Sequence, residues 1–371
     1  MSSSPRNTTN PPSGGSVPGL YPTPRRILIL SAAGIGDFVL ATPALRAIRR
    51  RFSGAEIWAL TIAEVRPLAE RCPYLNYVRT IDLRRSRSAL VWTFGSRRRE
   101  FWGLVHELRG MSFDLALNLH CGGTFLGGLR MWSFLRLIGP TYTLARSDTD
   151  REVHNRSAGE PRHEVDAQLD LVRLIGAAPA DDRPELWITA EDRQACHTLL
   201  ATRGIRGDAL FACIHFGSAQ QEKRWPTDRF AAVGRRVAEA GAQVLLIGGT
   251  GERALGESLA REIPGGVSLV GETPLPLLAA LLERAALLIT NDSGPMHMAA
   301  ALGTPLVVAF GPGSPNRFGP RGRAASRVLS STQHRGGPPW WEGVPVEAVC
   351  EAALDLLDEA SADRPPPDST S

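Results

Sequence analysis

Residues 25–43 read RRILILSAAGIGDFVLATP and join an apolar run to a turn that contains two glycines. The run from Arg25 to Leu30 predicts the first strand of a parallel sheet. A glycine-rich turn after such a strand usually binds a phosphate at the start of a helix. In this turn Asp37 follows the second glycine, and Val39 stands where a third glycine is expected. A carboxylate in a poorly solvated turn repels a pyrophosphate, so a dinucleotide-binding fingerprint is disfavoured.

The role of Asp37 has two interpretations at this point. In the first, Thr42 is the N-cap and Pro43 the first residue of a helix over residues 44–51. Residues 31–41 are then a loop that presents Asp37 toward a cleft. In the second, Asp37 caps a helix that begins earlier, and Pro43 kinks that helix from inside. The spacing of the residues does not separate the two.

Apolar runs alternate with amphipathic stretches in two series. The first series contains residues 25–30, 57–61, 77–83 and 114–120, and the second contains 210–216, 243–249, 286–292 and 305–311. Strands that alternate with helices indicate parallel sheets, so we expect an α/β fold with two open domains that bind a ligand at the carboxyl ends of their strands. Amphipathic helices are predicted over residues 226–240 and 345–359. The predicted units are a disordered tail over residues 1–24, an N-terminal domain over 25–182, a C-terminal domain over 183–359 and a second tail over 360–371.

The composition is that of a globular protein. Of the 371 residues, 43% are hydrophobic and 22% are charged, and no apolar run is long enough to predict a transmembrane helix. The first 19 residues lack the apolar segment of a secretory signal, which favours a cytoplasmic location. Five cysteines are scattered and never form a C-x-x-C pair, which disfavours both a disulfide framework and a thiolate zinc site. They are Cys72, Cys121, Cys196, Cys213 and Cys350.

The arginines of the first half form two clusters although the net charge is only +4. Each arginine taken alone is most simply a solvated loop residue. Two clusters this close favour a rim that faces anions, with phosphorylated or carboxylated partners. Such a rim suits transient contact with the inner membrane surface, and no nucleic-acid partner is expected. The clusters are Arg84, Arg85 and Arg87, followed by Arg97, Arg98 and Arg99.

A turn in the second half has the features of a phosphate site. A buried strand over residues 286–292 is followed by a turn over 293–295 and by a helix over 296–302, which Gly303 ends. Backbone N–H groups and the helix dipole form an anion site there. The polar residues of this site are Asp292, Ser293, Gly294 and His297. Any strand, turn and helix in series offers such a site, and a single histidine is more often structural, but four such residues in one turn favour ligand binding.

Two further segments end at the same predicted sheet edge. After the strand over 210–216, Lys223 or Arg224 is expected to fold back on a phosphate while Trp225 packs under the loop. An ordinary surface charge is the alternative for either basic residue. After the strand over 243–249, Glu252 is expected to accept hydrogen bonds from ribose hydroxyls. The alternative is a glutamate in the first turn of a helix, stabilised by the helix dipole.

Asp148 and Asp150 form a D-x-D pattern that many sugar transferases use to hold a divalent metal. They lie in a polar segment flanked by arginines, and no strand leads into it. We therefore expect these carboxylates to face solvent, and we expect no required metal.

Four motifs resemble the heptosyltransferase family, the inverting glycosyltransferases of GT-B fold typified by ADP-heptose:lipopolysaccharide heptosyltransferases. They are RRILILSAAGIGDFVLATPALRAIRRRF from residue 25, EKRWPTDRFAAV from residue 222, VLLIGGTGERAL from residue 244 and LLITNDSGPMHMAAALGTPLVVAFGP from residue 287. The match extends over residues 25–357. The resemblance implies two Rossmann-like open parallel-sheet domains facing across a cleft, and a nucleotide-sugar donor, ADP-heptose, with no separate cofactor.

The resemblance also implies roles for single residues. Asp37 corresponds to the general base that deprotonates the acceptor hydroxyl. The donor-binding residues are Ser218 and Lys223 at the phosphates, Glu252 at the ribose, Thr273 near the adenine, and Asp292, Ser293, Gly294 and His297 in the donor-binding turn. The acceptor is expected to be anionic or a saccharide, such as a sugar of the lipopolysaccharide core.

Three alternatives stay open. Because residues 86–166 depart from the family pattern, the same fold could use another nucleotide sugar on a small-molecule natural product. The chain could instead be a nucleotide-binding module without transferase activity, although Asp37 in its glycine turn counts against this. A dehydrogenase that binds NAD through Gly34 and Gly36 is disfavoured by Asp37 and Val39.

Overall fold

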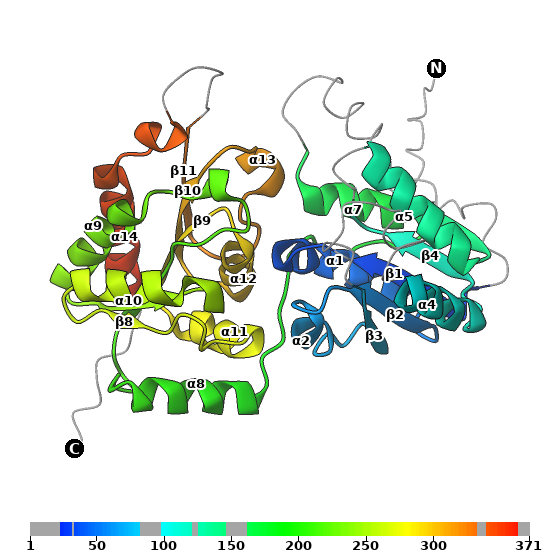
Figure 1. The fold of residues 1–371 in the computed structure, drawn as a ribbon, viewed down its shortest axis with the longest axis horizontal. Helices are drawn as coiled ribbons and strands as arrows, with labels where there is room; N and C mark the ends of the chain where they lie inside the picture. The colour runs from blue at the N-terminus through cyan, green and yellow to red at the C-terminus, as the bar shows by residue number, and fades with distance from the viewer. Residues whose placement is uncertain are drawn as a thin grey trace, which may run out of the picture.

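The computed structural model describes residues 23–31, 33–81, 98–120, 125–145, 162–331 and 339–362. Within these residues it contains two parallel sheets that lie side by side, each with helices on both faces (Figure 1). The α/β prediction is confirmed. Several predicted features lie outside the described residues, namely most of both tails, Arg84, Arg85, Arg87, Arg97, Cys121, Asp148 and Asp150.

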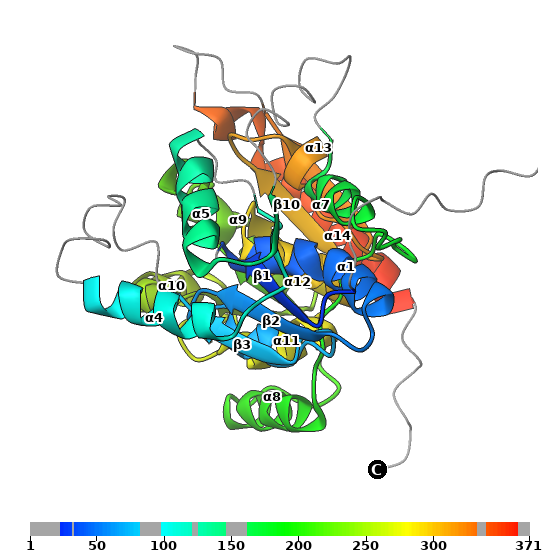
Figure 2. The same cartoon turned by 90° about the vertical axis from the view of Figure 1, so that its right-hand side faces the viewer.

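The first sheet has the order β3-β2-β1-β4-β5 in the described part of the chain. Its side chains alternate between two helical layers. Ile27 and Ile29 of β1 pack with α1 and α7, whereas Leu28 and Leu30 pack with α4 and α5 (Figure 2). The elements are β1 (Arg26–Ser31), α1 (Ile35–Arg51), β2 (Glu56–Thr61), α2 (Arg66–Ala69), β3 (Tyr77–Thr80), α4 (Arg98–Gly110), β4 (Leu115–Asn118), α5 (Phe125–Ile138), β5 (Tyr142–Ala145) and α7 (Glu164–Arg173).

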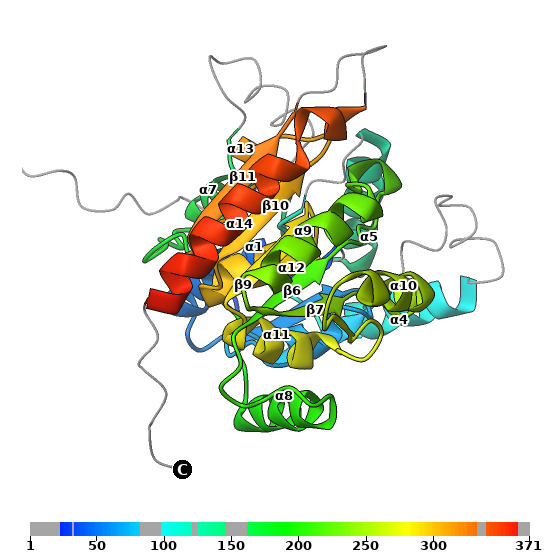
Figure 3. The ribbon, with the colours of Figure 1, turned by 90° about the vertical axis from the view of Figure 1, so that its left-hand side faces the viewer.

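The second sheet has the order β11-β10-β9-β6-β7-β8. Ala212 and Ile214 of β6 face α9, α10 and α14, which lie in front of the sheet in Figure 3, while Phe211 and Cys213 face α11 and α12. The elements are α8 (Ala190–Thr202), β6 (Phe211–His215), the 3₁₀ turn η1 (Gln221–Lys223), α9 (Thr227–Glu239), β7 (Gln243–Ile247), η2 (Thr250–Glu252), α10 (Arg253–Glu262), β8 (Val267–Ser268), α11 (Leu275–Arg284), β9 (Leu287–Asn291), α12 (Gly294–Leu302), β10 (Leu306–Phe310), α13 (Pro315–Phe318), β11 (Ser326–Ser330), η3 (Trp340–Gly343) and α14 (Val346–Ala362).

The prediction that Thr42 and Pro43 begin a helix after a long loop is wrong. Helix α1 begins at Ile35, and Pro43 lies inside it. Proline has no N–H, so the carbonyl of Val39 lacks its backbone donor. The Thr42 hydroxyl donates to the Val39 carbonyl over 2.7 Å and supplies the missing hydrogen bond. The helix therefore runs through the proline.

The same hydroxyl connects α1 to the segment between the two sheets. The Glu185 backbone N–H donates to Thr42 Oγ1 over 2.9 Å, and the Glu185 carboxylate pairs with Arg46 at 2.5 Å. The predicted domain boundary near residue 182 falls in this segment, between α7 and α8. The boundary itself stays a prediction.

Helix α7 joins the first lobe to residues 317–321 of the second. His163, the N-cap of α7, donates from Nε2 to the Gly319 carbonyl at 3.2 Å and accepts from the Val165 backbone N–H at Nδ1. Arg317 pairs with the buried Glu164 at 3.3 Å. Burial lowers the pKa of His163 and so favours its neutral imidazole. These contacts set the position of α7, and through it of α1, against the second lobe.

Two further sequence expectations concern the cysteines and membrane-spanning helices. Four of the cysteines, at positions 72, 196, 213 and 350, are buried and free, as expected of structural residues. Burial raises the pKa of Cys72 to about 12. Among the helices that the structure describes, none has the length and apolar character required to cross a bilayer.

Candidate active site

The first turns of α1 and α12 meet where the two sheets face each other (Figure 1). A Cβ atom built on Gly36 would overlap the ring of His297, and one built on Gly294 would lie 2.9 Å from Cβ of Ile35. Only glycine at these two positions allows the backbones to approach so closely. The contact brings the turn that follows β1 against the turn that follows β9, so Asp37 lies beside the first turn of α12.

Asp37 is the third residue of α1 and caps its N-terminus. Its Oδ2 atom accepts the backbone N–H of Gly34 over 2.7 Å. The interpretation of Asp37 as the cap of a helix that begins earlier is thus confirmed. The other oxygen, Oδ1, lies 3.4 Å from Nδ1 of His120, and the side chain keeps 25% of its surface exposed. One oxygen is therefore held by the backbone, while the second faces the site.

Helix α12 has no such cap. It begins at Gly294, two residues earlier than predicted, because Pro295 fits the first turn of a helix. The Ser293 hydroxyl at the N-cap makes no capping bond and instead contacts His215 Nδ1 at 3.1 Å and Thr290 Oγ1 at 3.0 Å. Within the described residues the N–H groups of the first turn thus have no side-chain acceptor, which is the condition for binding an anion there.

His297 lies one turn into α12 and is 94% buried, with a relative exposure of 6%. Its Nδ1 atom finds no hydrogen-bond partner in the part of the chain that the structure describes. Burial lowers the pKa of His297 to about 4, although the Asp37 carboxylate acts in the opposite direction. The ring is therefore a neutral imidazole with an unused nitrogen, which suits a polar ligand group.

Three of the predicted donor-binding residues form one cluster. Lys223 Nζ lies 2.5 Å from Oδ2 of Asp292, whose side chain is buried. The hydroxyl of Ser218 donates to the Asp292 carbonyl over 3.3 Å. Because Lys223 neutralises Asp292, the turn before α12 carries a paired carboxylate instead of an unscreened one.

Arg224 and Trp225 shape the loop that carries Lys223. Both Nε and an NH2 group of Arg224 donate to the Ser218 carbonyl, at 2.9 and 2.7 Å, so this arginine braces the loop. Trp225 is buried, and its backbone N–H donates to Asn291 Oδ1 over 2.9 Å. The prediction that Trp225 packs under the loop is confirmed.

Glu252 and Thr273 lie near the end of β7. Glu252 Oε2 accepts the Gly249 N–H over 3.0 Å, so the first-turn interpretation of this glutamate is confirmed. Its other oxygen lies against Gly217, where a Cβ atom would overlap it, and 3.5 Å from Arg224. The segment before Thr273 is held at the end of β7 by a hydrogen bond: the backbone N–H of Gly271 donates to the Gly248 carbonyl over 2.9 Å.

Residues 144–336, just over half of the chain, match the model of glycosyltransferase family 9 (heptosyltransferase). The chain belongs to this family. Lipopolysaccharide heptosyltransferase 2 of Salmonella typhimurium is 28% identical over 323 residues, which cover 82% of this chain and 87% of that protein. Lipooligosaccharide heptosyltransferase 2 of Haemophilus ducreyi is 32% identical over 333 residues, 81% and 87% of the two chains. The crystal structure of a family 9 glycosyl transferase from Veillonella parvula superposes with a TM-score of 0.74 at 24% identity over 90% of this chain and 98% of that one.

These comparisons confirm two predictions. The two facing parallel sheets are the GT-B fold of the solved heptosyltransferases, and the chain is a glycosyltransferase. The alternatives of a dehydrogenase and of a nucleotide-binding module without transferase activity are not supported.

Sequence reasoning missed two histidines of this glycosyltransferase. His120 follows β4 at the carboxyl edge of the first sheet and faces Asp37. His215 ends β6, is buried and contacts Ser293, and burial lowers its pKa to about 4. Both stand at the ends of predicted strands, and that position is the sequence signal that could have identified them.

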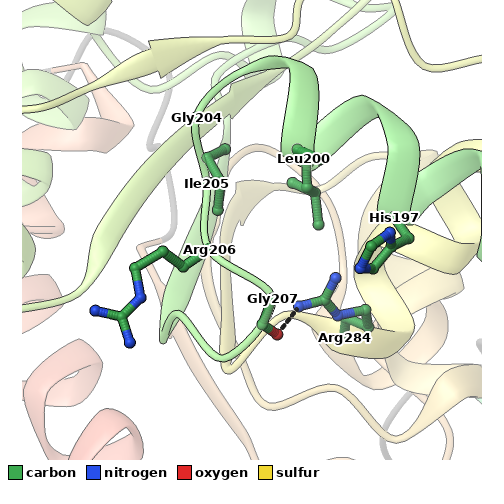
Figure 4. A pocket seen from close by; sticks show the side chains of 8 residues that line it. His197, Leu200, Gly204, Ile205, Arg206, Gly207 and Arg284 are labelled. Carbon is green, nitrogen blue, oxygen red and sulfur yellow. Dashed lines mark hydrogen bonds between the residues drawn. The ribbon is translucent and has the colours of Figure 1, made fainter. Parts of the chain in front are cut away.

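The structure also bears on pockets and metal sites elsewhere in the glycosyltransferase. A surface pocket of about 320 Å³ lies between α8, the following loop and Arg284, which donates to the Gly207 carbonyl over 2.8 Å (Figure 4). It contains none of the predicted site residues. Among the described residues, no group of three or more His, Cys, Asp and Glu side chains is arranged to hold a metal ion.

Proposed function

We propose that this glycosyltransferase transfers a heptose from ADP-heptose to a hydroxyl group of a saccharide acceptor such as the lipopolysaccharide core, with inversion and without a metal. The observation that carries the proposal is the position of Asp37 beside the uncapped first turn of α12. One lobe thus offers a base and the other an anion site at the same contact. The family motifs and the names of the two relatives, a lipopolysaccharide and a lipooligosaccharide heptosyltransferase, support heptose as the sugar and a lipopolysaccharide or lipooligosaccharide as the acceptor.

In the reaction, the acceptor oxygen attacks the anomeric carbon from the face opposite the diphosphate. The new glycosidic C–O bond forms while the bond from the anomeric carbon to the phosphate oxygen breaks, and ADP leaves with that electron pair. Asp37 takes the acceptor proton, a contribution of about 10² to 10⁴ in rate. Oδ1 is the oxygen suited to this step, because it faces the site and has lone pairs for more than one donor, whereas Oδ2 is turned to the Gly34 N–H.

The leaving diphosphate meets preorganised donors in the second lobe. The free N–H groups of α12, the neutral ring of His297 and the Lys223 ammonium all lie around the same turn. Donors fixed before the reaction stabilise developing negative charge strongly in a site sheltered from water. Lys223 also cancels the charge of Asp292, which would otherwise repel the phosphates. This set can replace a metal ion.

The nucleoside part of the donor is assigned to the end of β7. Glu252 keeps one oxygen outside its capping bond, which suits an acceptor for ribose hydroxyls. Thr273, half-buried in the adjoining loop, is the proposed neighbour of the adenine. Arg98 and Arg99 are exposed at the start of α4 and belong to the proposed anion-facing rim. Such a rim fits an anionic acceptor and transient contact with the cytoplasmic face of the inner membrane.

The decisive variant is Asp37→Asn. The amide oxygen keeps the acceptor for the Gly34 N–H, so α1 stays capped, while the base is lost. We expect kcat to fall by about 10²- to 10⁴-fold, with unchanged thermal stability and unchanged affinity for ADP-heptose by calorimetry. The exposed Asp208→Asn is the matched control. Transfer by Asp37→Asn at the wild-type rate would refute the catalytic assignment.

The substrate and the metal are tested separately. Among ADP-heptose, ADP-glucose and UDP-glucose, ADP-heptose should protect the protein most from thermal unfolding, by about 2.7 kcal/mol at a hundredfold excess over Kd. Transfer should persist in EDTA, and the product anomer, read by NMR, should be inverted. Activity that EDTA abolishes and Mg²⁺ restores would contradict metal independence, and stronger protection by UDP-glucose would contradict the donor.

A further inference from the structure

The second oxygen of Asp37 has a neighbour in the first lobe. Strand β4 pairs in parallel with β1, and Leu30 is opposite Asn118, so the residues after both strands emerge at the same sheet edge. His120 is two residues beyond this pair, and its backbone N–H donates to Asn118 Oδ1 over 3.3 Å. The short turn holds the imidazole toward Asp37, which is 83 residues away in the sequence.

The contact involves one oxygen of the Asp37 carboxylate. Asp37 Oδ2 is used by the Gly34 N–H, and Oδ1 lies 3.4 Å from His120 Nδ1. That nitrogen is shielded from solvent and has no other hydrogen-bond partner in the described part of the chain, although the side chain as a whole is 36% exposed. A buried ring nitrogen beside a carboxylate is most stable when it carries the proton and donates it. A separation of 3.4 Å is long for a hydrogen bond, and such contacts in enzymes without substrate often tighten in the Michaelis complex.

The two imidazoles near Asp37 differ in what they can do. His297 is buried, and its ring atoms Cδ2 and Nε2 lie where a Cβ atom on Gly36 would be. Among the described histidines, His120 is the one whose ring nitrogen lies within 4 Å of Oδ1. It is therefore the residue able to fix the orientation of that oxygen.

We propose that His120 is a positioning residue for this glycosyltransferase: its Nδ1–H donates to Oδ1 of Asp37 and aims the carboxylate at the acceptor hydroxyl. The inference rests on the proposed role of Asp37 as the base. Asp37 is then held at both oxygens, by the Gly34 N–H from its own helix and by His120 from the neighbouring strand end. A base must lie within hydrogen-bond reach of the proton that it removes, and a misplacement of about 1 Å can lower the rate 10²-fold.

The test compares His120→Ala with His120→Asn. Alanine removes the donor, and kcat should fall about 10- to 100-fold while KM for ADP-heptose stays within about twofold. Asparagine keeps an N–H donor near the position of Nδ1, and it should restore most of kcat. His197→Ala, in the pocket beside α8, is the control histidine and should leave both constants unchanged. Wild-type kcat in His120→Ala, or a loss in His120→Asn equal to that in His120→Ala, would overturn the inference.

A double-mutant cycle separates action through Asp37 from an independent role. In the Asp37→Asn background, His120→Ala should cause no further loss of kcat, because the base that it positions is absent. An additive loss would overturn the inference. The cycle also separates this inference from the proposed function. If Asp37→Asn transfers normally, the catalytic assignment fails, whereas an inactive Asp37→Asn with a fully active His120→Ala refutes the role of His120 alone.

Discussion

Helices α1 and α12 begin in the same way, but the N-terminus of α1 is capped by a carboxylate and that of α12 is not. Each follows a buried strand, each enters through glycine, and their first turns touch. The third residue of α1 is Asp37, whose carboxylate occupies the N-terminus of its own helix. The third residue of α12 is Met296, which offers no acceptor, and the N-cap serine points to His215 and Thr290. The N-terminus of α1 is capped by a carboxylate of its own, whereas that of α12 has no side-chain cap and is the proposed ligand site.

The turn η2 supports this distinction. Glu252 caps it through the Gly249 N–H, as Asp37 caps α1. The turns before α1 and η2 are therefore each closed by a carboxylate one turn later, and the proposed diphosphate site is at α12. A glycine-rich turn after a strand thus predicts an anion site only when its third helical residue leaves the N–H groups unused.

Filling the start of α12 should have the largest effect. In Ser293→Asp, a carboxylate caps α12 and repels the diphosphate, so affinity for ADP should fall about 100-fold, or about 2.7 kcal/mol, by calorimetry. Ser293→Ala removes the hydroxyl without adding charge and serves as the control. Undiminished ADP binding by Ser293→Asp would show that the diphosphate does not use α12.

Separating the two helices should have the next largest effect. In Gly36→Ala, the new methyl group meets the His297 ring, and unfolding in urea should show a loss of about 2 kcal/mol. Gly103→Ala in α4 is the control, because no atom lies within 4 Å of its Cβ position. There, alanine should stabilise the helix by about 0.5 to 1 kcal/mol. Equal effects at both positions would mean that the α1–α12 contact carries no constraint.

The proline inside α1 allows a third test. Thr42→Val leaves the Val39 carbonyl and the Glu185 N–H without the hydroxyl that they share, and the free energy of unfolding should fall by about 1 to 2 kcal/mol. Thr198→Val in α8 removes an exposed hydroxyl bonded to the Gln194 carbonyl and should change stability much less. Chemical denaturation of the two variants gives the comparison.

Acidification should lower the free energy of unfolding through the buried histidines. Of the four tests, replacing one of these histidines should have the smallest effect. The pKa of His297 is about 4 in the folded state, below its ordinary value of 6.5, so below pH 6.5 the unfolded chain binds a proton that the folded one does not. The stability present above pH 6.5 is lost as the pH falls toward 4, by up to about 1.4 kcal/mol per pH unit for this group. His297→Gln should reduce the slope of unfolding free energy between pH 6.5 and 5.5. An unchanged slope would show that His297 is not buried as a neutral ring.

The sequence predicted the long central strands and the turns of the site, because the buried strands β1 and β9 each contain a run of consecutive apolar residues. It missed β5, β8 and β11, which are edge strands with mostly half-exposed residues and, for β8, only two residues. It left the start of α1 undecided, because Pro43 has the pattern of a first helical residue. The hydrogen bond by which Thr42 lets the helix continue through Pro43 depends on one hydroxyl rotamer. His120 was missed because only the pairing of β1 with β4 brings it to Asp37.

The hydroxyl of Thr42 has a consequence for comparison among homologues. Pro43 creates an unsatisfied carbonyl at Val39, and Thr42 is the residue that satisfies it while also receiving the Glu185 N–H. A homologue that replaces the proline regains a backbone N–H for the carbonyl at position 39. A hydroxyl at position 42 is then no longer needed as the donor to that carbonyl. The two positions should therefore covary, so that threonine or serine accompanies proline and apolar residues appear at position 42 mainly where the proline is absent.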